Sequence, residues 1–160
     1  MTQKNNPSVE ETIQTVETLK QNNKHKQALD TVLVGLKQHT DDYRLYEELA
    51  DIYLYQGNIE KAEEVIGYAR ELHPESGTGI FLEGYIAVEK GDFDGAIKIL
   101  SKANLQFPNN PEILRNLGWS YVMKGSVDKG IILLRRALAL DPDHPITIQN
   151  LSNALLSVDQ

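Results

Sequence analysis

The sequence contains no cysteine among its 160 residues. This absence excludes disulfides, thiolate metal sites, catalytic thiols and cysteine-borne lipids. It fits a reducing compartment, so we expect a cytoplasmic protein. Runs of about eighteen apolar residues are also missing, and the start MTQKNNPSVEET lacks the apolar core of a secretory signal. The sequence therefore predicts neither a membrane-spanning helix nor insertion into a membrane.

An excess of basic residues is missing too. The chain has 16 Lys and Arg against 23 Asp and Glu, a net charge of -7. Nonspecific nucleic-acid binding needs a basic surface, so no nucleic-acid partner is expected. The charge is uneven, because residues 43–76 carry eight acids and three bases whereas residues 111–144 carry four acids and five bases. Such a gradient can orient a protein partner.

Catalytic motifs are absent from the sequence as well. No G-x-G-x-x-G, P-loop, G-x-S-x-G or H-E-x-x-H pattern occurs. The four histidines lack the convergent spacing of metal ligands, and His39 and His73 are predicted near helix ends, where a cation complements the helix dipole. Asp92 and Asp94 are typical of a helix start. We predict no catalytic residue, no metal site and no cofactor, hence a protein that is not an enzyme.

What the sequence does contain is a repeat of 34 residues. Several residue types recur at this spacing, and agreement at several positions with one period predicts a repeat architecture. The recurring residues are Pro74, Pro108 and Pro142; Gly57, Gly91 and Gly125; Gly84 and Gly118; and Ala69, Ala103 and Ala137.

Each repeat is interpreted as two helices joined by a turn. In residues 111–144, the segment ILRNLGWSYVMKG has apolar residues at helical spacing and ends at Gly125, where a left-handed backbone is easily adopted. The segment VDKGIILLRRALALDP repeats this spacing, and Pro142 stops it. Small residues would let the paired helices approach closely. They are Ala62, Ala96 and Gly130 in the second helix, and Gly84 and Gly118 in the first.

This pattern resembles the tetratricopeptide repeat family. The resemblance covers residues 43–76, 77–110 and 111–144 as three full units. It implies an all-α fold, a right-handed α-solenoid of stacked antiparallel helix pairs. Besides the alanines and prolines above, the matching residues are Leu49-Ala50, Glu83-Gly84 and Leu117-Gly118, then Tyr53, Ala87 and Tyr121, then Ala62, Ala96 and Gly130.

The two ends of the chain follow the pattern less closely. Residues 9–42 align as a divergent helix pair, in which Asn23 replaces the turn glycine and Thr40 replaces the proline. Residues 145–157 align with a first helix alone, and we expect them to form a C-terminal capping helix. We also expect residues 1–8 to be disordered and the helices to form a single domain.

Three residues stand out within the helix pairs. Glu83 occupies a position that is leucine in other repeats. A buried unpaired carboxylate costs several kcal/mol, so we expect the Glu83 carboxylate to be paired or to remain in contact with solvent. Tyr53 and Tyr121 occupy a position inside the pair and are expected to be core residues.

The resemblance implies that first helices line a concave face and indicates which of their residues point inward. Aromatic and apolar residues gather there, bordered by two acids on one side and by an arginine and an asparagine on the other. A contiguous apolar patch containing Trp, Tyr and Met is typical of an interaction site. We therefore predict a scaffold whose groove binds a peptide or helix of a protein partner. The predicted binding residues are Glu47, Asp51, Tyr55, Phe81, Tyr85, Val88, Arg115, Asn116, Trp119, Val122 and Met123.

Other interpretations stay open at this level. Trp119 could fold back into the core instead of lining the groove. The chain could self-assemble through apolar terminal helices, where Ile146 and Leu156 are more apolar than a cap needs. It could also be a secretion-type chaperone or an accessory subunit of a larger complex. Some family members bind a terminal carboxylate with lysines and asparagines. Here Glu47 and Asp51 would repel that group, so this specificity is rejected.

Overall fold

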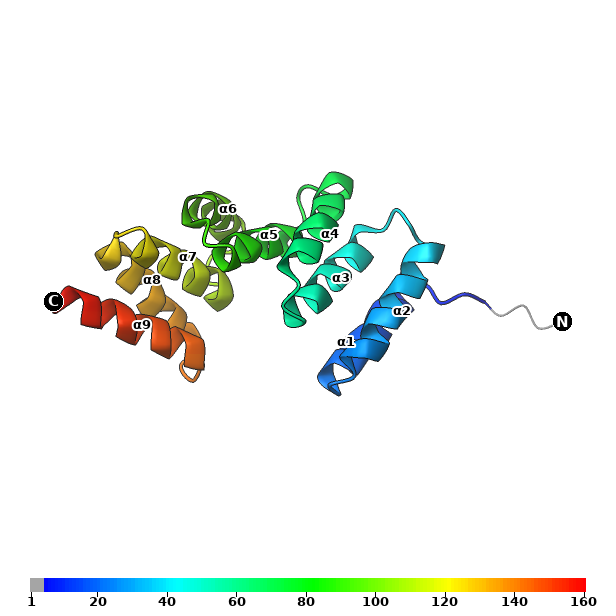
Figure 1. Ribbon diagram of the computed structural model, residues 1–160, viewed down its shortest axis with the longest axis horizontal. Coiled ribbons are helices and arrows are strands. Elements are labelled where there is room, and N and C mark those ends of the chain that lie inside the picture. The colour runs from blue at the N-terminus through cyan, green and yellow to red at the C-terminus, as the bar shows by residue number, and fades with distance from the viewer. Residues whose placement is uncertain (1–4) are drawn as a thin grey trace. The chain divides into compact units, whose positions relative to one another are not determined.

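The computed structural model describes residues 5–160, which form nine α-helices and no β-strand (Figure 1). The expected disorder of residues 1–8 falls partly on residues 1–4, which lie outside the described part. The helices are α1 (Val9–Gln21), α2 (His25–Gln38), α3 (Tyr43–Tyr55), α4 (Ile59–Leu72), α5 (Gly77–Glu89), α6 (Phe93–Gln106), α7 (Pro111–Met123), α8 (Val127–Leu140) and α9 (Pro145–Val158).

The helices belong to two compact units, with the boundary between Leu82 and Glu83 inside α5. In the first unit, α1 packs on α2, α2 on α3 and α3 on α4. In the second unit, α6 packs on α7, α7 on α8 and α8 on α9. Within each unit these helices thus pack on their neighbours in sequence, as a helical repeat requires. The expected single domain stays a prediction.

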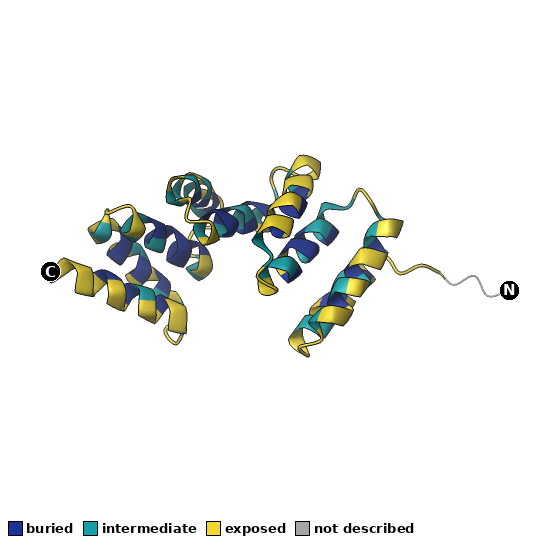
Figure 2. Ribbon diagram, viewed as in Figure 1, coloured by how far each residue is buried: buried dark blue, intermediate teal, exposed yellow. Residues whose placement is uncertain are grey.

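The core of each unit lies between neighbouring helices, where Figure 2 shows the buried faces. Leu45 and Ile52 of α3 are fully buried in the first unit, as are Leu114 of α7 and Leu134 of α8 in the second. Ala69, Ala103 and Ala137 occupy one repeat position and are all buried at 1% exposure or less. Buried residues recur at repeat positions because the two helices of each pair pack against one another in the same way.

The turns inside the helix pairs have the predicted conformation. Gly57, Gly91 and Gly125 have φ of 73°, 74° and 87°, in the left-handed region that favours glycine. Asn23 occupies the same repeat position in the first pair and has φ of 58°. Asparagine is the residue that best tolerates this region after glycine. Asn23 therefore adopts the backbone conformation of the turn glycine that it replaces, as predicted.

Two glycines of the first unit give a matched test of this backbone effect. A Cβ at either Gly57 or Gly67 would meet nothing within 4 Å, but only Gly57 has positive φ. We expect Gly57→Ala to lower the free energy of unfolding by about 1 kcal/mol, because the left-handed region penalises a Cβ. Gly67→Ala, inside α4, should raise it by about 0.5–1 kcal/mol through helix propensity. Urea denaturation followed by circular dichroism measures the free energy of unfolding of both variants. Equal changes in the two variants would contradict the backbone effect assigned to Gly57.

The small residues at the helix crossings have the predicted packing role. A Cβ built on Gly84 of α5 would lie 2.5 Å from Leu100 Cδ2 of α6. One built on Gly118 of α7 would lie 3.0 Å from the carbonyl oxygen of Gly130 on α8. The backbones of α7 and α8 therefore approach to a separation that leaves no room for a side chain.

The structure corrects the expectation that Tyr53 and Tyr121 are core residues, because both rings are only half-buried. Lys61 Nζ lies over the Tyr53 ring at 5.5 Å from its centroid, and Lys129 Nζ lies over Tyr121 at 4.2 Å. Each tyrosine thus packs one side against its helix pair and presents the other to an ammonium group. Glu83 is likewise half-buried, so it is not sealed in the core.

Candidate partner-binding face

The eleven predicted binding residues lie on the first helices α3, α5 and α7. Helical spacing of four places three of them in one stripe on α3, namely Glu47, Asp51 and Tyr55. The equivalent stripe on α7 is Arg115, Trp119 and Met123. Among the eleven residues, those up to Phe81 belong to the first unit and those from Tyr85 belong to the second.

Glu47 of the first unit is buried at 7% exposure, not open on a groove rim as the sequence indicated. Its carboxylate accepts hydrogen bonds from the Ser76 hydroxyl and from the backbone N–H of Gly79. Burial raises the pKa of Glu47, and these hydrogen bonds oppose that rise. A Cβ at Gly79 would lie 3.0 Å from Glu47 Oε1, so glycine leaves room for the carboxylate. Glu47 therefore acts locally as a link between α3 and the start of α5.

This environment predicts a pH-dependent stability. Because the pKa of Glu47 is raised on folding above 4.5, its contribution is fully present below pH 4.5 and lost as pH rises through the folded pKa. Glu47→Gln, which stays neutral, should raise the free energy of unfolding relative to the native chain at pH 7. Near pH 4 the difference should disappear. Urea denaturation at both pH values tests this, with exposed Glu64→Gln as the control. A gain that persists at pH 4 would contradict it.

Asp51 is exposed but not a free acid. Lys20 Nζ of α1 lies 2.8 Å from both Asp51 Oδ2 and Glu48 Oε2 of α3. Burial would lower the pKa of Lys20, but the hydrogen bonds to Asp51 and Glu48 outweigh it and raise the pKa. Of the two acids predicted to border the groove, Asp51 is therefore partly neutralised within the first unit. The sequence did not indicate this pairing between two helices.

The two aromatic residues of the first unit differ in exposure. Tyr55 is 67% exposed and stacks on His25 of α2, with the ring centroids 3.6 Å apart and an interplanar angle of 15°. Phe81 on α5 is half-buried. Tyr55 is therefore an ordered apolar surface at the exposed end of the α3 stripe.

On α7 the structure buries two residues that the sequence placed at an open border. Arg115 and Asn116 are each 8% exposed. Asn116 Nδ2 donates to the carbonyl oxygen of Glu112 at 2.8 Å, and Arg115 Nη1 lies 3.5 Å from Thr147 Oγ1 of α9. Burial lowers the pKa of Arg115, and its interaction with Glu112 opposes this. Helices packed on both sides of α7 cover these side chains, which a single-helix pattern cannot reveal.

The other residues of the second unit divide into packed and open positions. Val122 is half-buried and packs against the core cluster formed by Ile131, Leu134, Leu151 and Ala154, so its predicted place in the binding face stays a prediction. Trp119, with Tyr85 and Val88 on α5, is half-buried, and Met123 is 48% exposed. Trp119 is thus neither a sealed core residue nor fully open. Trp119 and Met123 are the part of the α7 stripe that solvent reaches.

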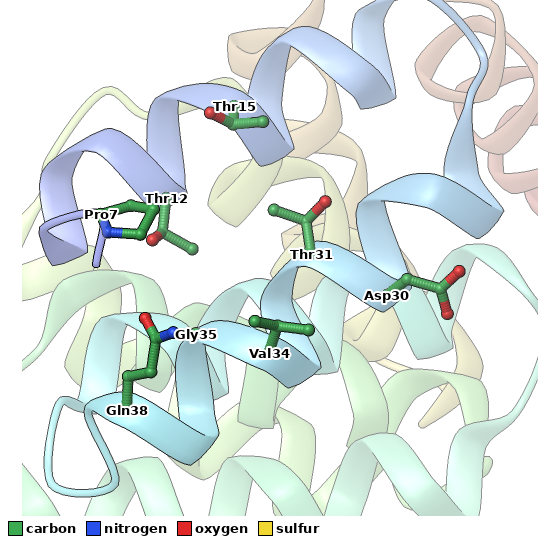
Figure 3. Close-up of a pocket in the computed structure, with 8 residues that line it drawn as sticks. All are labelled: Pro7, Thr12, Thr15, Asp30, Thr31, Val34, Gly35 and Gln38. Carbon is green, nitrogen blue, oxygen red and sulfur yellow. The ribbon is translucent and has the colours of Figure 1, made fainter. Parts of the chain in front are cut away.

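Sequence reasoning missed a cavity of about 320 Å³ between α1 and α2 (Figure 3). Thr12 and Thr15 of α1 lie on one side of it, and Thr31 and Val34 of α2 on the other. The hydroxyls of Thr15 and Thr31 donate to backbone carbonyls of their own helices, and that of Thr12 donates to the carbonyl of Ser8, the N-cap of α1. Thr15 occupies the position of Leu49 and Leu117, so a smaller side chain leaves the first pair underfilled.

No group of three or more His, Asp or Glu side chains within residues 5–160 could hold a metal ion. Within the same range, every helix is too short or too polar to cross a bilayer.

Comparison with known families gives two matches. The family model described as "Tetratricopeptide repeat protein 21 ARM repeat" matches residues 1–111, and the model "Tetratricopeptide repeat" matches residues 87–155. Among curated proteins, BBSome complex member BBS4 of Bos taurus is 35% identical over 95 residues, which cover 59% of this chain and 18% of that protein. BBS4 of Xenopus tropicalis is 31% identical over 91 residues, which cover 57% and 17%. The matched region thus spans less than a fifth of these relatives.

Solved structures resemble the chain over most of its length. The protein TTC0263 of Thermus thermophilus has a TM-score of 0.78 at 22% identity, and the match covers 94% of this chain and 83% of that one. YrrB, described as having an unusual peptide-binding site, has a TM-score of 0.71 at 18% identity, with 92% and 76% covered. These likenesses show the fold and confirm the predicted all-α repeat solenoid class.

Proposed function

This chain belongs to the tetratricopeptide repeat family, and we propose that it is a non-enzymatic scaffold that binds a segment of a protein partner along its first helices. Trp119 with Met123 carries the proposal. These two side chains follow one another at helical spacing on α7 and remain partly open, and the neighbouring half-buried Val122 packs against the core cluster. Large, adaptable apolar side chains at a partly exposed site favour a partner of peptide character.

The packing beneath this surface supports the proposal. Arg115 and Asn116, one turn before Trp119, are held by burial and hydrogen bonds. A half-buried tryptophan on such a base has less rotamer freedom to lose when a partner binds. The equivalent end of the α3 stripe carries Tyr55, which stacking on His25 also orders. Both units thus present an ordered aromatic or apolar side chain on a first helix.

The relatives support membership of an assembly, since the curated matches are members of a complex. An accessory subunit that contributes only its interaction surface fits the same residues. A cytoplasmic location fits a chain without cysteine. Self-assembly is the second candidate function, and the exposed Ile146 and Leu156 of α9 favour it.

The proposal predicts that Trp119→Ala weakens partner binding by roughly thirty-fold or more, the size expected of a buried aromatic anchor. Peptides selected on the native chain from a random display library serve as ligands, and calorimetry measures their affinity. Met123→Ala should weaken binding by a smaller factor, since its side chain is more exposed.

Leu105→Ala is the matched control, because Leu105 is 84% exposed on the second helix α6 of the same unit. Its affinity should equal that of the native chain. Equal affinities for Trp119→Ala and Leu105→Ala would place the binding surface elsewhere. Light scattering measures whether the chain is a dimer. If the selected peptides bind only the dimer, the result would favour self-assembly.

A further inference from the structure

The cavity between α1 and α2 is lined largely by small apolar groups. Thr12, Thr15 and Thr31 turn their hydroxyls to backbone carbonyls, which leaves their γ-methyl groups to line the cavity with Val34 (Figure 3). The cavity has a volume of about 320 Å³. An apolar cavity of about 150 Å³ is large enough to bind benzene. The space between α1 and α2 therefore has room for one aromatic ring.

The second helix pair shows what fills the equivalent place. At a separation of 34 residues, Tyr46 of α3 is equivalent to Thr12, and Tyr68 of α4 is equivalent to Val34. The two tyrosine rings lie beside each other, with their centroids 6.0 Å apart. The third and fourth pairs also carry larger side chains at these two positions, namely Ile80 with Lys102 and Leu114 with Arg136. The cavity in the first pair thus occupies the place that aromatic rings fill in the next pair.

Neighbouring helix pairs leave this place open to solvent. Tyr68 is 51% exposed although α2 of the first pair packs on α3. Arg136 of α8 is exposed although α6 of the preceding pair packs on α7. Val34 itself is 55% exposed. Since the equivalent positions stay open beside a packed neighbour, a further helix pair of the chain would not cover the cavity.

The charge at the rim of the cavity indicates what kind of aromatic ligand fits. Among the described residues that line it, only Asp30 is charged, and it lies one turn before Val34 on α2. A carboxylate at the edge of an apolar cavity favours a ligand with a positive charge beside its ring. Gln38 lies one turn after Val34, and its exposed amide can both donate to and accept from a peptide backbone.

We propose that this cavity binds a tyrosine side chain of a protein partner in which basic residues flank the tyrosine. The ring takes the place that Tyr46 and Tyr68 fill in the next pair, and the lysine or arginine beside it pairs with Asp30. The threonine hydroxyl oxygens keep lone pairs that can accept from the phenol O–H. This site lies in the first unit and does not involve Trp119 of the second, so either proposal can fail without the other.

A short peptide with this chemistry tests the proposal. The acetylated and amidated peptide Ala-Lys-Tyr-Lys-Ala is titrated into the full chain labelled with ¹⁵N, and amide chemical shifts are recorded. We expect saturable shifts in α1 and α2, with a dissociation constant of roughly 1 mM, as is usual for a ligand with one anchoring ring. The peptide Ala-Lys-Ala-Lys-Ala has the same charge and should bind at least tenfold more weakly. Equal affinities for the two peptides would overturn the proposal.

Tyramine distinguishes a protein partner from a small molecule, because it keeps the phenol ring and the positive charge but lacks the peptide backbone. It should bind at least threefold more weakly than the tyrosine peptide. Equal or tighter binding of tyramine would make a small aromatic amine the ligand and would overturn the assignment to a protein partner.

Variants of the full chain locate the site. Val34→Tyr places in the cavity the residue found at Tyr68, so it should weaken peptide binding at least tenfold while circular dichroism shows native helicity. Leu33→Tyr is the matched control, because Leu33 is 37% exposed on the same helix and does not line the cavity. Its affinity should stay within twofold of native. Equal affinities for the two variants would overturn the proposal.

Two further variants test the charge and the occupant. Asp30→Asn should weaken binding of the lysine-flanked peptide at least threefold, and an unchanged affinity would contradict the proposed role of the carboxylate. Removal of residues 1–4 should leave the affinity within twofold of native. A tenfold gain on their removal would make the chain's own first residues the occupant of the cavity and would overturn the proposal.

Discussion

Leu134→Ala is expected to lower the free energy of unfolding by about 3 kcal/mol. Leu134 of α8 is fully buried in a cluster with Ile131, Leu151 and Ala154. Its Cγ also lies 3.0 Å from the point where a Cβ on Gly118 would stand, so it contacts α7 as well as α9. Truncation removes apolar contacts on both sides of α8 and leaves a cavity that close-packed helices cannot fill.

Urea denaturation followed by circular dichroism measures this loss. Leu140→Ala is the control in the same helix, because Leu140 is 46% exposed and its truncation should cost less than about 1 kcal/mol. Similar losses for the two variants would contradict the packing described for the second unit.

Gly130→Ala should lower the free energy of unfolding by about 2 kcal/mol, although alanine is the better helix former. Its Cβ would lie 2.4 Å from Val122 Cγ2 and 2.6 Å from the backbone oxygen of Gly118. A side chain can rotate away, but the Gly118 carbonyl can move only if α7 and α8 separate. The equivalent residues of the first unit, Ala50 and Ala62, are both fully buried alanines. The expected loss of stability is therefore specific to the contact between α7 and α8 and is not a property of every repeat.

A double variant separates the two contacts. Val122→Ala removes the side-chain contact but leaves the Gly118 oxygen in place, so it should restore only part of the stability lost in Gly130→Ala. Both are measured by urea denaturation. Full restoration would show that α7 and α8 are farther apart than the structure places them.

The fold could be predicted from the sequence because the repeat samples each position several times. Gly57, Gly91 and Gly125 adopt the left-handed turn that their spacing indicates, and Asn23 adopts it in the divergent first pair. These turn conformations depend on the local preference of the backbone, which the type of residue at the turn position indicates.

Exposure on the first helices was predicted less well. Glu47, Arg115 and Asn116 were expected at an open border and are buried, because residues from other helices cover them. Glu47 is bound by Ser76, which is 29 residues away, and Arg115 lies against Thr147 at a separation of 32. A helical pattern gives the face on which a residue lies, but the contacts across repeats decide whether that face is open.

Two departures from the repeat pattern near the last helices can be detected by comparing repeat positions in the sequence. Ile132 occupies a position that is otherwise charged, and Val158 replaces a lysine that forms an ion pair in the preceding repeat. Attention to the groove positions alone passes over such departures on other faces. Departures from a repeat pattern toward apolar residues are therefore informative wherever they occur.

The emission of Trp119 tests the central claim most directly, because Trp119 is the only tryptophan in the chain. If a partner segment lies along the open part of the α7 stripe, it must remove water from this half-buried indole. A titration with a selected peptide should shift the emission to shorter wavelength and saturate at the stoichiometry found by calorimetry. An emission spectrum that stays unchanged at saturation, while calorimetry reports binding, would show that the partner binds away from Trp119 and would contradict the account.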